Sequence, residues 1–195
     1  MILSYTTIAN YKRSRHSLLN KQAGREIPTT PEMESGRIAH KIIEDHCTGL
    51  VSDKRLTGLT WRFQKAEHHT SMELDSEVTL HGYADLISFD KKVMGEIKTS
   101  GTPWSAGKFL ELMQWKYYGW LSGFRQFLFI TCKPDLSGLR VYYQEGTDKD
   151  INEAEEWTRE AVADIKARKF NDLIDGKCDG SCPYKQNCLF YQGGV

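Results

Sequence analysis

The segment from Gly82 to Ser100 has the pattern of a β-hairpin, yet it carries charged side chains where a core is expected. Strand-forming residues lie on both sides of Asp90-Lys91, which suits a turn. With a two-residue turn there, Asp85 lies opposite Glu96, with about 5 Å between the Cβ atoms. Lys98 then shares a face with Glu96, because side chains alternate along a strand. The pattern therefore predicts two carboxylates and an ammonium at one spot.

Such a cluster is costly on a largely apolar strand pair unless something neutralises it. A divalent cation is the natural partner of the two carboxylates, because such ions prefer oxygen ligands. The alternative is a surface hairpin with ordinary solvated charges. The register is also a hypothesis, since a slip of one residue would put Asp85 on the opposite face from Glu96.

Length and composition are those of a globular protein with its own core. The chain has 195 residues, of which 39% are hydrophobic and 27% are charged. Its formal net charge is zero, so a polyanionic partner would have to be bound by a local basic patch. The segment 11–25, with Arg13 and Arg15, is one candidate. A solvated basic face is the alternative that composition supports equally.

No apolar run approaches the length of a membrane span, and the N-terminus lacks the apolar region of a signal peptide. We therefore expect a cytoplasmic protein in a reducing compartment, without membrane contacts. The five cysteines are then expected to be free or metal-bound rather than disulfide-bonded.

The order of predicted elements indicates an α/β fold, with a central mixed sheet flanked by helices. Helices are expected over 4–19, 34–47, 108–122 and 147–170. Strands are expected over 59–65, in the hairpin 77–99, and over 126–132 and 139–144. We interpret 1–195 as a single domain, with a helical N-terminal part (1–50), a core (59–170) and a cysteine-bearing tail (171–195).

His40 lies in the expected helix 34–47, on the face that carries Ile43 and Cys47. It therefore points inward. An inward histidine is more often a hydrogen-bonded core residue than a metal ligand, and both interpretations stay open. Gly36, one turn earlier on this face, would let another backbone approach closely.

Gln114 and Tyr118 lie four residues apart in the expected helix 108–122, so they face the same side. An aromatic residue at this spacing is usually part of the core. A polar neighbour alone does not change that interpretation.

The tail carries three cysteines within eleven residues, Cys178, Cys182 and Cys188. This spacing, with Gly and Pro in the loops, is typical of ligands to zinc or to an iron–sulfur cluster. The alternative is three unrelated buried cysteines. The candidates for a fourth ligand are Cys47, Cys132 and His16, and the sequence does not choose among them.

Taken together and in this order, the motifs resemble those of the RecB-type branch of the PD-(D/E)XK nuclease superfamily. The matching motifs are Gly36-x-x-x-His40, Gly82-x-x-Asp85, Glu96-x-Lys98 and Gln114-x-x-x-Tyr118. The tail is similar to the cysteine triplet of that branch's iron–sulfur members, which include the small exonuclease of CRISPR adaptation and AddB-type helicase-nucleases. The opening segment 4–13 is similar to the N-terminal helix of the family, so the resemblance spans nearly the whole chain.

The resemblance implies a restriction-endonuclease-like core with a helical cap, and a metal-dependent DNA exonuclease acting on single-stranded DNA or ends. By this resemblance, Mg²⁺ or Mn²⁺ would be held by His40, Asp85, Glu96 and the Ile97 carbonyl. The implied catalytic residues are Asp85, Glu96, Lys98, Gln114 and Tyr118. Lys98 would orient or activate a water molecule, while Gln114 and Tyr118 would position the DNA backbone or support Lys98. Glu67 is a weaker candidate for a further acidic position.

For the tail, the resemblance implies a 4Fe-4S cluster, or alternatively zinc, that pins it against the N-terminal helices. The cap so formed would make a channel for single-stranded DNA, with contacts from Arg13 and Arg15. One position departs from the family pattern, because Ser14 stands where cluster-bearing members have a cysteine. The fourth ligand and the cluster itself are therefore open.

Other functions use parts of the same pattern. A structure-specific or restriction-like endonuclease would use the same metal chemistry. A nucleic-acid-binding subunit would need a protein partner, for example in recombination, repair or CRISPR adaptation, but it has no evident use for Asp85, Glu96 and Lys98. A zinc-stabilised structural module would leave His40 and Gln114 unexplained.

Overall fold

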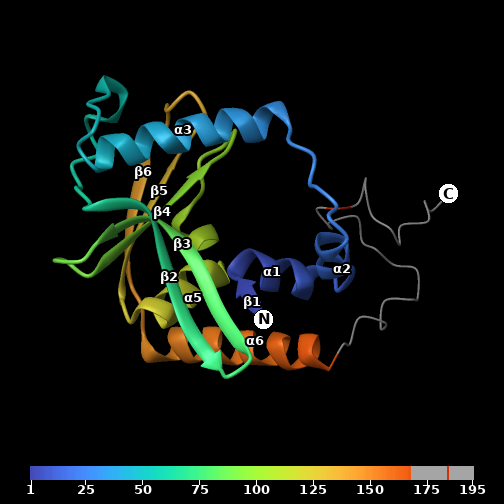
Figure 1. The fold of residues 1–195 in the computed structure, drawn as a ribbon. Coiled ribbons are helices and arrows are strands. Elements are labelled where there is room, and N and C mark those ends of the chain that lie inside the picture. Colours follow the sequence, from blue (N-terminus) through green and yellow to red (C-terminus); the bar gives the residue numbers. More distant parts are fainter. Residues whose placement is uncertain (168–183, 185–195) are drawn as a thin grey trace.

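The computed structural model describes residues 1–167 and residue 184, and it is an α/β fold built on one mixed sheet (Figure 1). The strands are β1 (Ile2–Ser4), β2 (Lys65–Asp75), β3 (Val78–Ser88), β4 (Val93–Thr99), β5 (Gln126–Cys132) and β6 (Arg140–Glu145). The helices are α1 (Tyr5–Arg13), α2 (His16–Gln22), α3 (Pro31–Cys47), α4 (Ala106–Leu110), α5 (Met113–Ser122) and α6 (Asp148–Lys166), with a short 3-10 helix at Lys54–Leu56. The fold class predicted from the sequence is confirmed.

Strand β3 is paired along one edge by β2 and along the other by two different strands. Antiparallel β2 follows nearly its whole length. On the other edge, parallel β1 pairs with residues 79–81 and antiparallel β4 pairs with residues 86–88. Residues 82–85 are left between these two ladders, so β3 and β4 separate at this point. Strand β5 continues the sheet parallel to β4, and β6 closes it antiparallel to β5.

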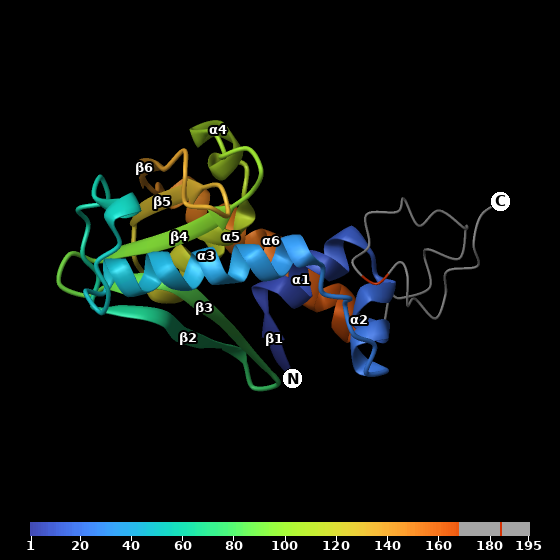
Figure 2. The same cartoon turned by 90° about the horizontal axis from the view of Figure 1, so that it is seen from above.

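The sheet separates two hydrophobic cores. Helix α3 lies across one face, where Ile43 and Cys47 pack against Leu86, Ile97 and Ile130 of the strands. Helices α1, α5 and α6 cover the other face (Figures 1 and 2), and the larger core lies between them and the sheet. The candidate site described below lies where these two layers meet the gap between β3 and β4.

Local signals explain where the main helices begin. Ser4 accepts a hydrogen bond from the Thr7 N–H at the start of α1, and Thr30 does the same for Met33 at the start of α3. Pro31 occupies the first turn of α3, where its missing N–H costs nothing. Thr147 and Asp150 form a capping box at the start of α6.

The register predicted for the hairpin is confirmed next to the turn, but the predicted Asp85–Glu96 pair lies beyond the end of the ladder, where the two strands separate. Leu86 pairs with Gly95 and Ser88 with Val93, which is the pairing that a turn at Asp90-Lys91 requires. Strand β5 also has the predicted bounds, and β6 and α6 differ from the prediction only at their ends.

Other predicted elements were wrong. No strand covers 59–64, which the structure describes as irregular, with Leu59 and Phe63 buried in the α3-side core. Strand β2 instead begins at Lys65. Its hydrophobic pattern is weak in the sequence, because one face of the strand is open to solvent and carries polar residues. The three-residue strand β1 is too short to give a periodic signal. The helices predicted over 4–19 and 108–122 are each divided into two, α1–α2 and α4–α5.

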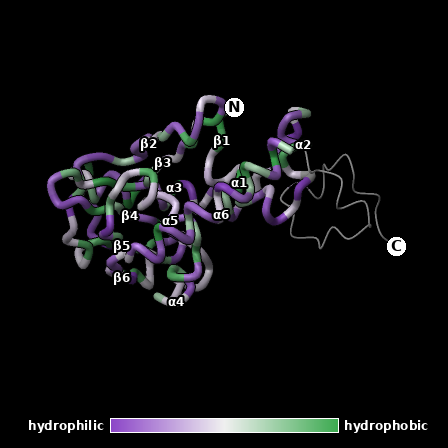
Figure 3. The backbone as a smooth tube through the Cα atoms, turned by 90° about the horizontal axis from the view of Figure 1, so that it is seen from below, coloured by the Kyte–Doolittle hydropathy of each residue, from purple (hydrophilic) through white to green (hydrophobic). Residues whose placement is uncertain are grey.

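Within residues 1–167, no helix is both long enough and apolar enough to cross a membrane. In Figure 3 hydrophobic stretches are short and alternate with hydrophilic ones along the trace.

Candidate active site

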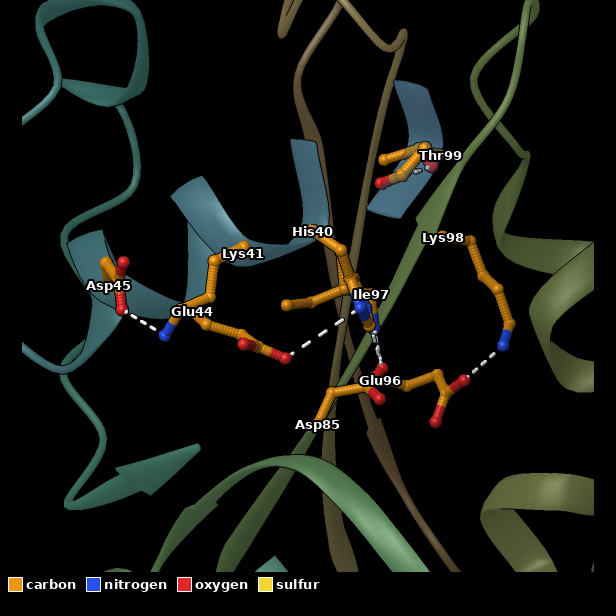
Figure 4. A network of polar contacts seen from close by, with 10 residues as sticks. His40, Lys41, Glu44, Asp45, Asp85, Glu96, Ile97, Lys98 and Thr99 are labelled. Atoms are coloured by element: carbon orange, nitrogen blue, oxygen red, sulfur yellow. Dashed lines mark hydrogen bonds and ion pairs between the residues drawn. The ribbon is translucent and has the colours of Figure 1, made fainter. Parts of the chain in front are cut away.

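Side chains from α3, β3, β4 and α5 converge where β3 and β4 separate. Asp85 comes from β3, Glu96 and Lys98 from β4, and His40 from α3, as Figure 4 shows. Gln114 on α5 completes the group by accepting a hydrogen bond from Lys98 Nζ at 3.0 Å. The structure therefore brings together charged and polar residues that lie up to 74 positions apart in the chain.

Asp85 is held by a backbone N–H that the sheet leaves unused. The β3–β4 ladder ends at Leu86 and Gly95, so the Ile97 N–H has no partner across it. Asp85 Oδ2 accepts a hydrogen bond from this N–H at 2.7 Å. The same oxygen lies 3.2 Å from Nε2 of His40. The separation of the two strands thus fixes the Asp85 carboxylate between Ile97 and α3.

His40 lies between two carboxylates. Its Nδ1 is 3.7 Å from Oε1 of Glu44, one turn further along α3, while Nε2 faces Asp85. Burial opposes protonation of the ring, but the hydrogen bond and charge of Asp85, aided by Glu44 and Glu96, raise the pKa of His40. Burial raises the pKa of Glu44, which is 3% exposed.

Glu96 and Lys98 form a buried ion pair. Glu96 is 4% exposed, and the Lys98 ammonium lies against its Oε1. Burial, together with the nearby Asp85 charge, raises the pKa of Glu96 to about 7. Burial disfavours the charged form of Lys98, but Glu96 and Asp85 outweigh it and raise the pKa of the ammonium. The lysine is therefore protonated at neutral pH.

Two motif glycines allow the close packing around these groups. A Cβ at Gly82 would overlap Cε1 of Tyr118, so the absence of a side chain lets this ring lie against β3. A Cβ at Gly36 would lie 2.9 Å from Oγ1 of Thr99, where α3 approaches the end of β4. Tyr118 is 8% exposed, and burial raises the pKa of its hydroxyl. This aromatic residue lies at the inner edge of the site, beside Gln114 on the same helix.

The chemistry of the donors suits a hard divalent cation. Glu96 Oε1 is buried and accepts no hydrogen bond, although Lys98 lies against it as an ion pair. The bonds that Asp85 accepts both end on Oδ2. Within the described part of the chain, however, no three His, Cys, Asp or Glu side chains stand close enough together to hold a metal ion as they are. Lys98 supplies the positive charge beside Glu96 in this structure.

The site opens into two clefts that meet at His40. One of about 740 Å³ runs between the N-terminal half of α3 and the end of β4, and Ile97 and Lys98 line it. The other, of about 420 Å³, extends past Glu44 to Glu67. A ligand could thus reach the charged group from either side of α3.

Sequence reasoning missed two residues of this site. Glu44 could have been found from its spacing, because it lies one helical turn after His40. Tyr5 gave no such signal. It begins α1, its ring centroid lies 6.3 Å from that of Tyr118, and the charge of Lys98 acts on its hydroxyl.

The structure describes only some of the candidate cluster ligands. Cys178, Cys182 and Cys188 lie outside the described residues. Cys47 and Cys132 are fully buried in the α3-side core, where burial raises their pKa to about 12 and about 11. Both are therefore neutral thiols in this fold. Ser14 ends α1 and is buried, and His16 begins α2.

The basic segment 11–25 is partly neutralised by α6. Lys12 pairs with Glu160, and Arg15 lies 3.7 Å from Asp164. Arg13 is exposed at the end of α1. The patch is thus smaller than the sequence indicates.

No family model and no curated protein matches the sequence. Among solved structures, the chain is similar to SSO0001, with 20% identity, a TM-score of 0.60, and coverage of 96% of this chain and 86% of that one. It is similar to an alkaline exonuclease, LHK-Exo from Laribacter hongkongensis, with 13% identity, a TM-score of 0.55, and coverage of 85% and 88%. It also resembles a phage-related exonuclease from Haemophilus somnus 129PT, with 13% identity, a TM-score of 0.54, and coverage of 84% of each chain. At these identities the likeness concerns the fold, which is the nuclease-like fold that the sequence motifs imply.

Proposed function

We propose that this protein is a metal-dependent DNA exonuclease that hydrolyses phosphodiester bonds in single-stranded DNA or at DNA ends. The observation that carries the proposal is the convergence of Asp85, Glu96 and Lys98 beside His40 at the split between β3 and β4. The fold shared with two exonucleases supports it. The structure of LHK-Exo in complex with dAMP also supports the proposal.

The residues suited to hold Mg²⁺ or Mn²⁺ are His40, Asp85, Glu96 and the Ile97 carbonyl. Oxygen ligands suit both ions, and an imidazole ligand favours Mn²⁺. Bound there, the ion would polarise the scissile phosphate and lower the pKa of a water molecule. The buried Glu96 carboxylate, which Lys98 neutralises in this structure, and the fixed Asp85 carboxylate are the protein's contribution to that site.

Lys98 acts as a charged hydrogen-bond donor in this proposal. Because its pKa is raised, the ammonium has no free pair with which to accept a proton. It can orient a water molecule and offset the negative charge that develops on the phosphate. Gln114 holds Nζ at 3.0 Å and so directs it toward the cleft that Lys98 lines.

Gln114 and Tyr118 occupy one face of α5 beside Lys98. Tyr118 is buried, and its hydroxyl shares a hydrogen bond with Gln114, so it can hold the amide that contacts Lys98. We propose that this pair supports Lys98 and positions the DNA backbone.

We further propose that Cys178, Cys182 and Cys188 bind a 4Fe-4S cluster or zinc. We also propose that the protein works in the cytoplasm, with protein partners that act in recombination, repair or CRISPR adaptation. Three closely spaced cysteines support the metal site. The buried, neutral thiols of Cys47 and Cys132 do not favour either as the fourth ligand.

The test compares linear and circular single-stranded DNA, each with Mg²⁺, Mn²⁺ or EDTA. An exonuclease degrades the linear strand from an end, leaves the circle intact and is inactive in EDTA. Cleavage of the circle would replace the proposal with an endonuclease. Tight DNA binding without cleavage in either metal would contradict both and favour a binding subunit.

A further inference from the structure

A row of aromatic side chains leads along β3 directly to the candidate site. His81 and Tyr83 are alternate residues of this strand and share one face, and Asp85 follows two residues later, where the faces of the strand change over. His69 of β2 is the cross-strand partner of Tyr83, so its side chain stands on the same face. The aromatic row thus ends at Tyr83, two residues before Asp85.

This face of β2 and β3 is uncovered in the described part of the chain. Figures 1 and 2 show α3 over the far end of β3, while α1, α5 and α6 lie behind the sheet. Tyr83 is 56% exposed, and His69 is exposed as well. The neighbours Gly82 and Ala84 point the other way and are buried, so Tyr83 fills no space in the core.

The three rings contact one another at angles of 49° (His69–Tyr83), 51° (His69–His81) and 80° (His81–Tyr83), and His81 is half-buried. The ring centroid of His69 lies 4.9 Å from that of Tyr83 and 5.6 Å from that of His81, and the His81 and Tyr83 centroids are 6.2 Å apart. Cross-strand packing explains such contacts in part. It does not explain why more than half of the tyrosine surface is left to solvent.

The charges on this face indicate how a nucleic acid would lie on it. The outward residues of β2 beside His69 are Ser71, Glu67 and Glu73, none of which is basic. Phosphates would therefore find little attraction beside His69, although the charge of Lys21 of α2 reaches His81, whereas unpaired bases would find ring surfaces. Stacking on aromatic side chains suits single strands, because paired bases have no free faces to offer.

We propose that His69, His81 and Tyr83 form a stacking platform for the bases of a single DNA strand whose backbone enters the site at Asp85. This inference rests on the proposed function, since it takes the strand that the site cleaves as the occupant. The phosphates point away from the sheet until the strand reaches Lys98.

The test uses Tyr83→Leu, which keeps an apolar side chain but removes the ring, and Tyr83→Phe, which keeps the ring. Tyr143→Leu is the matched control, because Tyr143 is 51% exposed on β6. Binding of fluorescently labelled oligo(dT) is measured by anisotropy in EDTA, where no cleavage occurs. Tyr83→Leu is expected to weaken binding by about tenfold to a hundredfold. Tyr83→Phe and Tyr143→Leu are expected to bind like the wild type.

Three further readouts separate stacking from other effects. Binding of duplex DNA, and the salt dependence of oligo(dT) binding, should be unchanged in Tyr83→Leu, because no phosphate contact is lost. Should Tyr83→Leu alter the melting curve, His69→Leu with an unchanged curve serves in its place. Equal oligo(dT) binding by the leucine variant and the wild type overturns the platform, as does an equal loss with duplex DNA.

A small chromogenic substrate distinguishes failure of this inference from failure of the proposed function. Thymidine 5′-(p-nitrophenyl phosphate) carries a single base and cannot cover the row of three rings, so its hydrolysis should fall less in Tyr83→Leu than oligo(dT) binding does. If the wild type hydrolyses neither this ester nor DNA while Tyr83→Leu still weakens oligo(dT) binding, the platform stands and the nuclease proposal fails. If the wild type hydrolyses both and Tyr83→Leu leaves oligo(dT) binding unaltered, the nuclease proposal stands and the platform fails.

Discussion

Lys98 and Glu96 each change the charge state of the other in a largely buried ion pair. Burial alone would neutralise both groups, but their contact keeps the lysine protonated and limits the rise in the pKa of the glutamate. The lysine is therefore an electrostatic element of the site, with Gln114 as its second anchor. Removing either residue should affect the reaction more than it affects DNA binding.

For Lys98→Ala we expect the single-turnover rate of cleavage to fall at least about a hundredfold, because one preorganised donor at a developing charge is typically worth that much. Affinity for DNA, measured by anisotropy in EDTA, should change little. Lys133→Ala, an exposed lysine in the β5–β6 turn, is the control and should cleave normally. Near-normal cleavage by Lys98→Ala would remove Lys98 from the catalytic group.

Glu96 should also make the stability of the metal-free protein depend on pH. Its pKa is raised from 4.5 to about 7, so the folded state binds more protons than the unfolded state in that interval, and ionisation lowers the free energy of unfolding as pH rises. Glu96→Gln lacks this loss. From about pH 5 to about pH 8, the free energy of unfolding of the variant should therefore rise by about 2 kcal/mol relative to that of the wild type.

Urea unfolding of both proteins in EDTA at the two pH values measures this difference. If the free energies of unfolding of the two proteins depend on pH in the same way, the pKa of Glu96 is not raised by burial.

Strand β3 determines where the site is, because it changes neighbours along its length. Between the β1 and β4 ladders it frees the Ile97 N–H for Asp85 and exposes Gly82 to the ring of Tyr118. The faces of the strand also change over here, since Ala84 belongs to the α5-side core and Leu86 to the α3-side core. Opposite this point, Glu67 of β2 has a φ of 47°, a backbone conformation that is rare outside glycine.

Gly82→Ala should therefore damage packing between β3 and α5. The added methyl group overlaps a buried ring, and overpacking of this kind costs about 1–3 kcal/mol of unfolding free energy. Tyr118→Ala removes the ring, so the double variant should lose less stability than the sum of the two single variants. Urea unfolding of the four proteins measures the coupling. Strict additivity would mean that the ring can move away freely.

Some of these elements could be predicted from the sequence and others could not. The hairpin register near the turn could be predicted from residue alternation and the turn at Asp90-Lys91. The helical patterns around His40 and Gln114 correctly predicted that both residues lie in helices. Strand β2 could not be predicted, because its open face is polar. The position of His69 beside Tyr83 could therefore not be predicted either. The reversal of faces near Asp85 lies opposite the positive φ of Glu67, and no residue type at that position signals either feature.

At the scale of the whole molecule, the two cysteines that the structure describes lie in the core. Cys47 and Cys132 are buried with raised pKa values, so a thiol reagent should reach them only after unfolding. Native protein treated with a strong chelator should then expose at most the three thiols of the tail to a disulfide reagent at pH 7, and denatured protein all five. Metal analysis before and after Cys182→Ser checks whether the tail binds a metal. Rapid reaction of five thiols in the folded protein would contradict the buried core.

If the protein is a metal-dependent nuclease, cleavage requires the charge of the carboxylate held at the split between β3 and β4. Asp85→Asn tests this claim most directly, because the amide keeps the shape of the side chain while removing its charge. The measurement is cleavage of end-labelled single-stranded DNA by wild type and variant, with Mg²⁺, with Mn²⁺ and with EDTA. We predict metal-dependent cleavage by the wild type and none by the variant, with both binding DNA in EDTA. Equal cleavage by the two proteins, or cleavage that survives EDTA, would contradict the claim.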